Sequence, residues 1–252
     1  MTTGALIFAY NNEQTDYVAM AQWSAKNIER HLGIPTHIVT GESTSSNSRY
    51  FSDYGTNVTW HNTTRTDAYS LSPWDRTLVL DADYVVASDQ LKVLLESNED
   101  FLAPNVAFDI VGLNDFAGLN YFGLHKMPML WATIMMFRKS IKAKLIFNTM
   151  EMVRDNWAHY RALYGNNNAS YRNDHALTIA INVVNGHTND YPLMPWKLAS
   201  LTPDHTLTQL SKDSYRIDYQ THNGKPKWIT ISGQDFHAMG KKHLGEIVAN
   251  PC

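Results

Sequence analysis

Two aspartates, Asp81 and Asp83, follow the apolar run "RTLVL" at residues 76–80. The run is typical of a buried strand, and residues i and i+2 of a strand face the same side, so both carboxylates should converge at its carboxyl end. Two carboxylates held that close repel each other unless a cation lies between them or one stays protonated. Mg²⁺ and Mn²⁺ take such oxygen ligands, often together with substrate phosphates. The pair therefore predicts either half of a divalent-metal site or an acidic strand end at the surface.

A second group of reactive side chains lies near the end of the chain, in "DFHAMGKKHLG" at residues 235–245. It contains His237, Gly240, Lys241, Lys242 and His243. A histidine nitrogen is a good ligand for Mn²⁺, a glycine lets the backbone approach a phosphate, and lysine neutralises diphosphate charge. The alternative is a histidine on a surface loop followed by a solvated lysine pair.

Taken in this order, the two motifs resemble those of nucleotide-sugar glycosyltransferases with the GT-A fold, in particular the glycogenin-like retaining type with D-x-D and H-x-x-G-x-x-K segments. The resemblance implies that Asp81, Asp83 and His237 hold Mn²⁺ or Mg²⁺. It also implies that Ala82 and Gly240 lie at the donor site and that Lys241 or Lys242 binds the diphosphate. The match is partial, because His243 stands where the family has its lysine and Lys242 comes one residue early.

The same resemblance places the nucleotide at the first strand and helix, "FAYNNEQTDYVAMAQWSAKNI". It implies a base pocket formed by Ala9, Tyr10, Asn11 and Tyr17, with Arg65 as a basic nucleotide contact. An aromatic ring and an amide at a strand tip can stack on a uracil-like ring and hydrogen-bond to it. Tyr10 could equally belong to the core, and Arg65 could equally be a solvated surface residue.

A helix is predicted to begin near Asn173 and Asp174, in "YRNDHALTIAI". Asn or Asp at a helix start is explained by capping and by the helix dipole alone. Similar helices in GT-A enzymes open with an acidic residue that touches the donor sugar, so Asp174 could instead orient sugar hydroxyls or act as a base. We expect His159 and His175 on helix surfaces. Four tryptophans are expected in the core or in a pocket wall, with Trp196 a candidate sugar platform; they are Trp74, Trp131, Trp157 and Trp196.

A phosphatase motif offers a competing interpretation of the acidic pair. "DADYV" fits the D-x-D-x-[TV] motif of haloacid-dehalogenase-like phosphatases, in which the first aspartate is a nucleophile. That motif normally follows the first strand of its domain, whereas here a complete strand–helix–strand unit precedes it. The alternatives to a transferase are therefore a phosphohydrolase or nucleotidyltransferase that uses Asp81 and Asp83, or a non-catalytic binder of nucleotide sugars.

The elements that must position these residues alternate between strand and helix. Apolar strands at 5–10 and 36–40 flank a helix that ends at Gly33, which predicts a parallel crossover unit. We predict an α/β fold, a GT-A-like, Rossmann-type, mostly parallel sheet flanked by helices. One domain should span 1–252, with a nucleotide-binding half (1–110) and an acceptor and donor-sugar half (111–252). Further strands are predicted at 57–60, 76–80, 101–108 and 132–137, a short helix or turn at 89–97, helices at 140–163 and 174–185, and a hairpin from "SYRIDYQ" and "KWITIS".

Composition places the chain among ordinary soluble globular proteins. The 252 residues carry a formal net charge of -3, so the overall charge does not indicate nucleic-acid binding. The single cysteine, Cys252, excludes a disulfide framework. No signal peptide is evident and no run approaches the roughly 18 apolar residues of a membrane span, so a cytoplasmic location is expected. Three sequons, at Asn57, Asn62 and Asn168, are interpreted as chance.

These motifs are compatible with several classes of acceptor. A small transferase could modify a saccharide, a lipid-linked saccharide, a protein, or a hydroxymethylated base in DNA. The opening "ALIFAYNNEQTDYVAMAQWSAKNIERHLGIP" resembles glycosyltransferase-like proteins of bacteriophages, which makes modified DNA in a host cytoplasm a candidate acceptor. The mild acidity of the chain argues against a DNA substrate, because phosphate contacts need a basic face. UDP is the favoured donor nucleotide.

Overall fold

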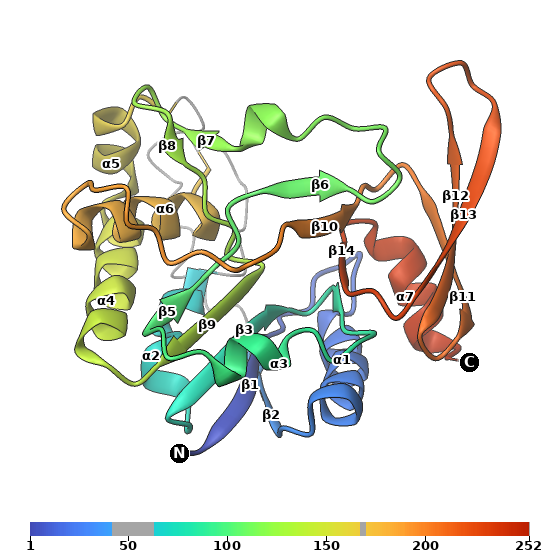
Figure 1. The fold of residues 1–252 in the computed structure, drawn as a ribbon, viewed down its shortest axis with the longest axis horizontal. Helices are drawn as coiled ribbons and strands as arrows, with labels where there is room; N and C mark the ends of the chain where they lie inside the picture. Colours follow the sequence, from blue (N-terminus) through green and yellow to red (C-terminus); the bar gives the residue numbers. More distant parts are fainter. Residues whose placement is uncertain (42–62, 167–169, 252) are drawn as a thin grey trace.

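A five-stranded sheet forms the centre of the computed structural model, which describes residues 1–41, 63–166 and 170–251 (Figure 1). The strand order is β2-β1-β3-β9-β5. Strand β1 pairs in parallel with β2 and β3, whereas β9 is antiparallel to both β3 and β5, so four of the five strands share one direction. The predicted α/β fold with a mostly parallel sheet is confirmed. The bounds are β1 Thr3–Phe8, β2 Thr36–Val39, β3 Arg76–Asp81, β5 Phe101–Leu102 and β9 Ile134–Arg138.

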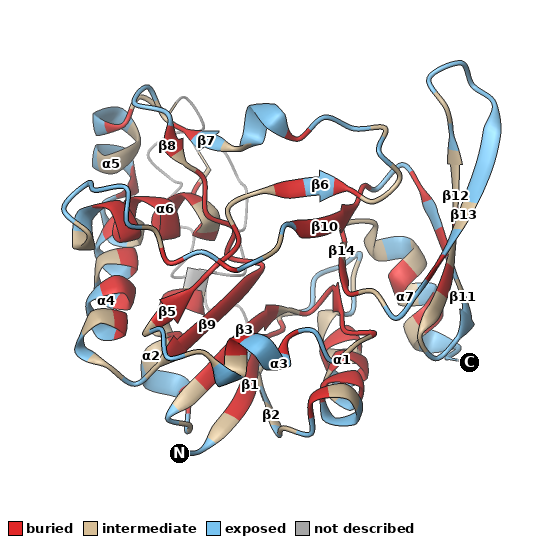
Figure 2. Ribbon diagram, in the orientation of Figure 1, coloured by how far each residue is buried: buried red, intermediate tan, exposed pale blue. Residues whose placement is uncertain are grey.

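Both faces of this sheet are buried, which explains why its strands are continuous apolar runs in the sequence. Along β1, Ala5 and Ile7 pack into one hydrophobic cluster and Leu6 and Phe8 into another. The first cluster includes residues of helices α1 and α7, and the second includes residues of α4 and α6. Figure 2 shows the central strands as buried between these layers.

Helix α1, Tyr17–Leu32, ends before Gly33, as its sequence predicts. The Asp16 carboxylate accepts a hydrogen bond from the Ala19 N–H at 2.9 Å, which caps the first turn. Gly33 closes the helix in the left-handed conformation at φ 69°, and its N–H donates to the Glu29 carbonyl. The predicted first strand, helix and second strand are thus confirmed.

A second, four-stranded sheet brings the end of the chain beside β3. Its order is β4-β14-β10-β6. The prediction of one strand over 101–108 is wrong. Its first residues form β5 of the five-stranded sheet, and its last residues form part of β6 in the four-stranded sheet. Pro104 lies between them and has no N–H to continue a ladder. The bounds are β4 Tyr84–Val85, β6 Ala107–Asp109, β10 Leu198–Leu201 and β14 Phe236–Ala238.

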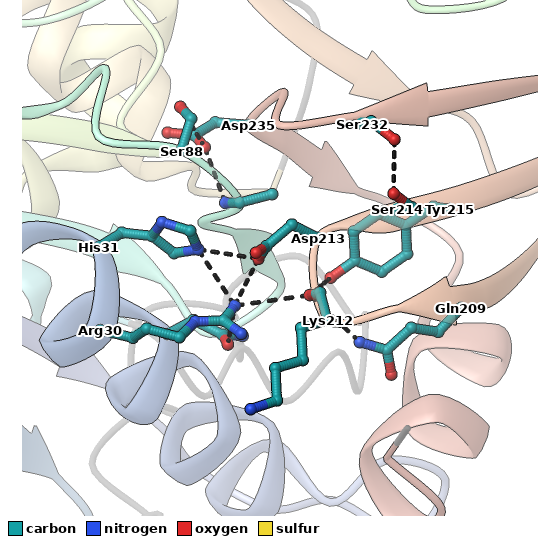
Figure 3. A network of polar contacts seen from close by, with 12 residues as sticks. Arg30, His31, Ser88, Gln209, Lys212, Asp213, Ser214, Tyr215, Ser232 and Asp235 are labelled. Carbon is teal, nitrogen blue, oxygen red and sulfur yellow. Dashed lines mark hydrogen bonds and ion pairs between the residues drawn. The ribbon is translucent and has the colours of Figure 1, made fainter.

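The predicted hairpin is confirmed and gains a third strand. Antiparallel strands β11 Thr206–Ser211, β12 Ser214–Gln220 and β13 Pro226–Ser232 form a sheet at the right of Figure 1. The β11–β12 turn is tied to helix α1 through one carboxylate: Asp213 accepts from Arg30 at 2.5 Å and lies 2.8 Å from the His31 Nε2 (Figure 3). These contacts are partly exposed, so they orient the turn and add little stability.

The remaining elements surround the sheets. The helix predicted over 140–163 is two helices, because the backbone leaves helical geometry at Asn156, with ψ at 34°. The segment 111–128 contains a short 3₁₀ turn and the two-stranded pair β7–β8. The bounds are η3 Thr63–Asp67, α2 Ala68–Leu71, α3 Lys92–Glu96, η4 Ala117–Leu119, β7 Tyr121–Phe122, β8 Met127–Pro128, α4 Ile141–Asp155, α5 Trp157–Leu163, α6 Asn173–Val184 and α7 Lys241–Ala249.

Two groups of sequence predictions remain untested by the fold. The strand predicted at 57–60 and the three sequons lie outside the described residues. Within the described ranges, no helix combines the length and the hydropathy that a bilayer crossing requires.

Candidate active site

The acidic pair lies where β3 ends. Asp81 is the last residue of β3, and Asp83 lies in the turn that leads to β4. The carboxylates do converge, but strand alternation is the wrong reason, because Asp83 is outside the strand. The turn directs Asp83 inward, so that only 6% of its side chain is exposed, against 20% for Asp81.

Sheet register delivers His237 to the same place. In the pairing of β14 with β4, His237 lies opposite Tyr84, the residue after Asp83. The Ala238 N–H also donates to the Asp83 carbonyl at 2.9 Å, which fixes the two segments together. One ligand atom from each of Asp81, Asp83 and His237 lies within 4.8 Å of the other two. Two carboxylate oxygens and one imidazole nitrogen are a donor set that suits Mn²⁺, so these residues fit the metal that the sequence implied.

Two cations neutralise this acidic group. Arg65 pairs with Asp81 and also donates to the Ala132 carbonyl at 2.6 Å. The Arg65 side chain is 3% exposed, so the alternative of a solvated surface arginine is wrong. Lys241 pairs with Asp83, whose Oδ2 also lies 3.3 Å from the His237 Nε2.

Burial and neighbouring charges shift the pKa values of Asp81, His237 and Lys241. Burial on its own raises the pKa of Asp81, but Arg65, His237 and Lys241 together outweigh it and hold that pKa below its ordinary value. Burial lowers the pKa of His237, although the Asp81 carboxylate opposes the shift. Burial also lowers the pKa of Lys241 to about 8. His237 is therefore favoured as a neutral imidazole, the form that binds metal.

Helix α6 contributes the other acidic residue of the site. The expected N-cap role is wrong for both candidates, because Arg172 is the N-cap and Asn173 begins the helix. Asp174 instead accepts from the Ala132 N–H at 2.8 Å and pairs with Arg172 at 2.8 Å. Asn173 is buried, and its side-chain oxygen accepts from the Tyr171 hydroxyl. The Ala132 peptide is thus held by Arg65 at its carbonyl and by Asp174 at its N–H.

A cavity of about 480 Å³ opens at this edge of the sheet. It contains all three candidate metal ligands, Asp174, and the aromatic rings of Tyr10 and Tyr17. The Tyr10 hydroxyl is 2.6 Å from the Thr64 Oγ1, and its ring also packs against the second hydrophobic cluster, so it serves both the pocket and the core. The full lining is Phe8, Tyr10, Asn12, Tyr17, Arg65, Asp81, Ala82, Asp83, Trp131, Thr133, Arg172, Asn173, Asp174, His237, Met239 and Lys241.

Four candidates lie outside this lining. Ala9 is buried in the core, and the Asn11 side chain accepts from the Val18 N–H at the start of α1. Gly240 is the N-cap of α7, and Lys242, one residue after the ion-paired Lys241, is exposed. Ala9 and Asn11 therefore do not line the cavity, and of the two lysines it is Lys241 that reaches it.

Sequence reasoning missed part of the lining. Thr133 and Arg172 carried no motif, although Thr133 directly precedes β9 at the same sheet edge as the D-x-D, which could have indicated it. Asn12, rather than Asn11, lines the cavity because the Asn11 side chain is engaged with α1. Trp131 lines the cavity, as one of the pocket-wall tryptophans expected from the sequence.

The other predictions for aromatic and histidine side chains are only partly confirmed. His159 is exposed as expected, but the surface prediction for His175 is wrong: it is buried, with ring centroids 4.9 Å from Phe122 and 5.7 Å from Trp157. Trp196 is partly buried against the first hydrophobic cluster and does not line the cavity, so it offers no platform there.

Comparisons with known proteins return glycosyltransferases among solved structures. No family model matches the chain, and a search of curated proteins finds no match. The galactosyltransferase LgtC, in complex with donor and acceptor sugar analogues, is 15% identical over 69% of each chain, with a TM-score of 0.45. Mouse xyloside xylosyltransferase 1 is 8% identical, over 74% of this chain and 83% of that one, with a TM-score of 0.44. Drosophila beta-1,4-galactosyltransferase 7, with manganese, UDP-Gal and xylobiose, is 12% identical over 63% of each chain, with a TM-score of 0.36. Likeness at this level assigns no activity to the chain.

Proposed function

We propose that the chain is a metal-dependent glycosyltransferase of the GT-A type that moves a sugar from a nucleoside-diphosphate donor, UDP-sugar favoured, to a hydroxyl acceptor. The observation that carries the proposal is the Asp81, Asp83 and His237 cluster, with ligand atoms within 4.8 Å of one another in a cavity of about 480 Å³. A cavity of this volume accommodates a ligand of the size of a nucleotide sugar. A Mn²⁺ or Mg²⁺ ion held there would act as a Lewis acid on the leaving diphosphate.

The chain's own residues divide the remaining work. Tyr10 and Tyr17 offer aromatic faces and hydroxyls to the nucleotide base, and Lys241 offers positive charge to the diphosphate. Asp174 is held in place by the Ala132 N–H and by Arg172, so its carboxylate is oriented before substrate binds. We assign Asp174 to the donor sugar or the incoming hydroxyl, with Asn173 supporting it. The resemblance to glycogenin-like enzymes favours retention at the anomeric carbon.

The charge of the cavity bears on the acceptor. Each cation in the described lining is paired with a carboxylate: Arg65 with Asp81, Arg172 with Asp174 and Lys241 with Asp83. A DNA backbone would need a basic face around the cavity, and the formal net charge of -3 argues against one. We therefore favour a saccharide or protein hydroxyl over a modified DNA base.

A donor screen tests the function class. The full chain is incubated with Mn²⁺ and a panel of nucleotide sugars, and separately with p-nitrophenyl phosphate, and the released nucleotide and phenolate are measured. We expect release of UDP from a UDP-sugar, lost in Asp83→Ala and His237→Ala and kept in Asp89→Ala, a control with a 73% exposed side chain. Phenolate without UDP would indicate a phosphohydrolase, and nucleotide binding without turnover on any acceptor would indicate a binder.

The acceptor is identified by mass spectrometry of candidate saccharides, proteins and hydroxymethylated DNA after turnover. A mass increase of one sugar on DNA alone would overturn the preference for a saccharide or protein. The anomeric configuration of the product, read by NMR, tests retention.

A further inference from the structure

Asp83 is shared between two partners that have different freedom to move. Its Oδ2 contacts the Lys241 ammonium and lies 3.3 Å from the His237 Nε2. Asp83 and His237 are two of the three residues whose ligand atoms could hold a divalent ion. The Lys241 ammonium therefore engages a carboxylate that a divalent ion would also use.

The two cations of the site differ in mobility. Arg65 is 3% exposed and is also fixed by the Ala132 carbonyl, so it cannot leave Asp81 without breaking buried contacts. Lys241 is 30% exposed, and its side chain has a flexible four-carbon stem. Of these two cations, Lys241 is the one that can withdraw toward solvent.

The position of Lys241 in its helix points the same way. It is the first residue of α7, directly after the N-cap Gly240. A helix N-terminus carries partial positive charge and disfavours a lysine there. The contact with Asp83 offsets this unfavourable placement while no divalent ion competes for the carboxylate.

We infer that Lys241 is a resident cation that occupies Asp83 in the metal-free protein and competes with the divalent ion for that carboxylate. The inference rests on the proposed function, since it requires that Asp81, Asp83 and His237 bind a metal. Metal binding must then displace Lys241 from Asp83, because an ammonium and a divalent ion repel each other at contact distance. The apparent affinity for metal is weakened by the free energy of breaking the ion pair.

The test is a calorimetric titration of the full chain with Mn²⁺ alone, without nucleotide. Lys241→Met should bind Mn²⁺ at least about tenfold more tightly than the wild type, since 1.4 kcal/mol corresponds to a factor of ten. Lys242→Met is the matched control: it removes the same charge from the next, exposed position and should bind within about twofold of the wild type. Equal Mn²⁺ affinities for the two lysine variants would overturn the inference.

A second measurement on the wild type does not depend on any variant folding. Acetylation of lysines with a water-soluble reagent, read by peptide mass spectrometry, should increase at Lys241 when Mn²⁺ is added and stay constant at Lys242. An unchanged Lys241 signal at saturating Mn²⁺ contradicts the displacement.

The failures of the two proposals are distinguishable. Mn²⁺ binding that is lost in His237→Ala but unaffected by Lys241→Met keeps the metal site and overturns only the competition. No Mn²⁺ binding by either the wild type or Lys241→Met overturns both the metal site and the competition.

Discussion

Replacing Arg65 with methionine tests how the acidic site is held together. The substitution keeps an unbranched apolar stem and removes the guanidinium that pairs with Asp81 and donates to the Ala132 carbonyl. Asp81 then lies in the cavity wall without its main counter-ion, and the Ala132 oxygen loses its 2.6 Å partner. Loss of stability is expected at neutral pH, where Asp81 is charged.

The magnitude follows from the exposure of the two partners. Removing one member of a fully buried ion pair costs about 3–5 kcal/mol, whereas exposed pairs contribute about 0–1 kcal/mol. Arg65 is 3% exposed and Asp81 is 20% exposed, which places this pair between those limits but nearer the buried one. We expect Arg65→Met to lower the free energy of unfolding by about 3 kcal/mol at pH 7.

Urea unfolding of a double-mutant cycle isolates the pair. Asp81→Asn in the Arg65→Met background should recover about 2 kcal/mol, because no carboxylate is left unpaired. Arg138→Met is the matched control, since its pair with Asp100 is about one-third exposed and should cost less than about 1 kcal/mol. The reasoning is refuted if the stability cost of the double variant equals the sum of the costs of Arg65→Met and Asp81→Asn to within about 0.5 kcal/mol.

The pH dependence is a further check on the same pair. The pKa of Asp81 is held below its ordinary value in the folded protein, so its contribution is present above the unfolded pKa of about 3.8 and is lost as pH falls through the lower folded value. Arg65→Met should therefore lose less stability than the wild type on acidification below pH 4.

Two further predictions concern the core that supports the site. Burial lowers the pKa of His175 to about 4, so the free energy of unfolding should fall by at most about 3 kcal/mol as pH falls from about 6.5 to 4. His175→Phe should abolish that part of the pH dependence in urea unfolding. An unchanged pH profile in the variant contradicts the burial argument. A Cβ at Gly4 would lie 2.2 Å from the Trp74 ring, so Gly4→Ala should lower stability by about 1–3 kcal/mol, whereas Gly118→Ala, with open space at its Cβ, should change the melting temperature little; equal melting temperatures for the two variants would show that Trp74 moves aside.

The sheet and its helices were predictable where the signal is local. Strands β1 and β3 are buried on both faces, so their residues are apolar without alternation, and the helix between β1 and β2 carries its own capping signals at Asp16 and Gly33. The split of 101–108 into two sheets was not predictable from hydropathy, because strand pairing depends on distant partners in β9 and β10. Only Pro104 hinted at the break.

In the candidate site too, residue types were predictable from the sequence, whereas their three-dimensional environments were not. Asp81, Asp83 and His237 could be selected because carboxylates and imidazole are metal ligands, and the structure brings them together. The environments of Arg65 and His175 could not be predicted, since their burial depends on the Ala132 segment and on Phe122 and Trp157. The N-cap expectation failed because Asp174 finds a partner, the Ala132 N–H, on a different element.

The most direct test of the central claim is to locate the metal in crystals grown with Mn²⁺ and UDP. The account predicts an anomalous-scattering peak in contact with a carboxylate oxygen of Asp81 or Asp83 and with the His237 Nε2, with the diphosphate of UDP as a further ligand and its base beside Tyr10 and Tyr17. A map with UDP bound in the cavity and no Mn²⁺ peak between these three residues, or with the peak elsewhere, would contradict the account.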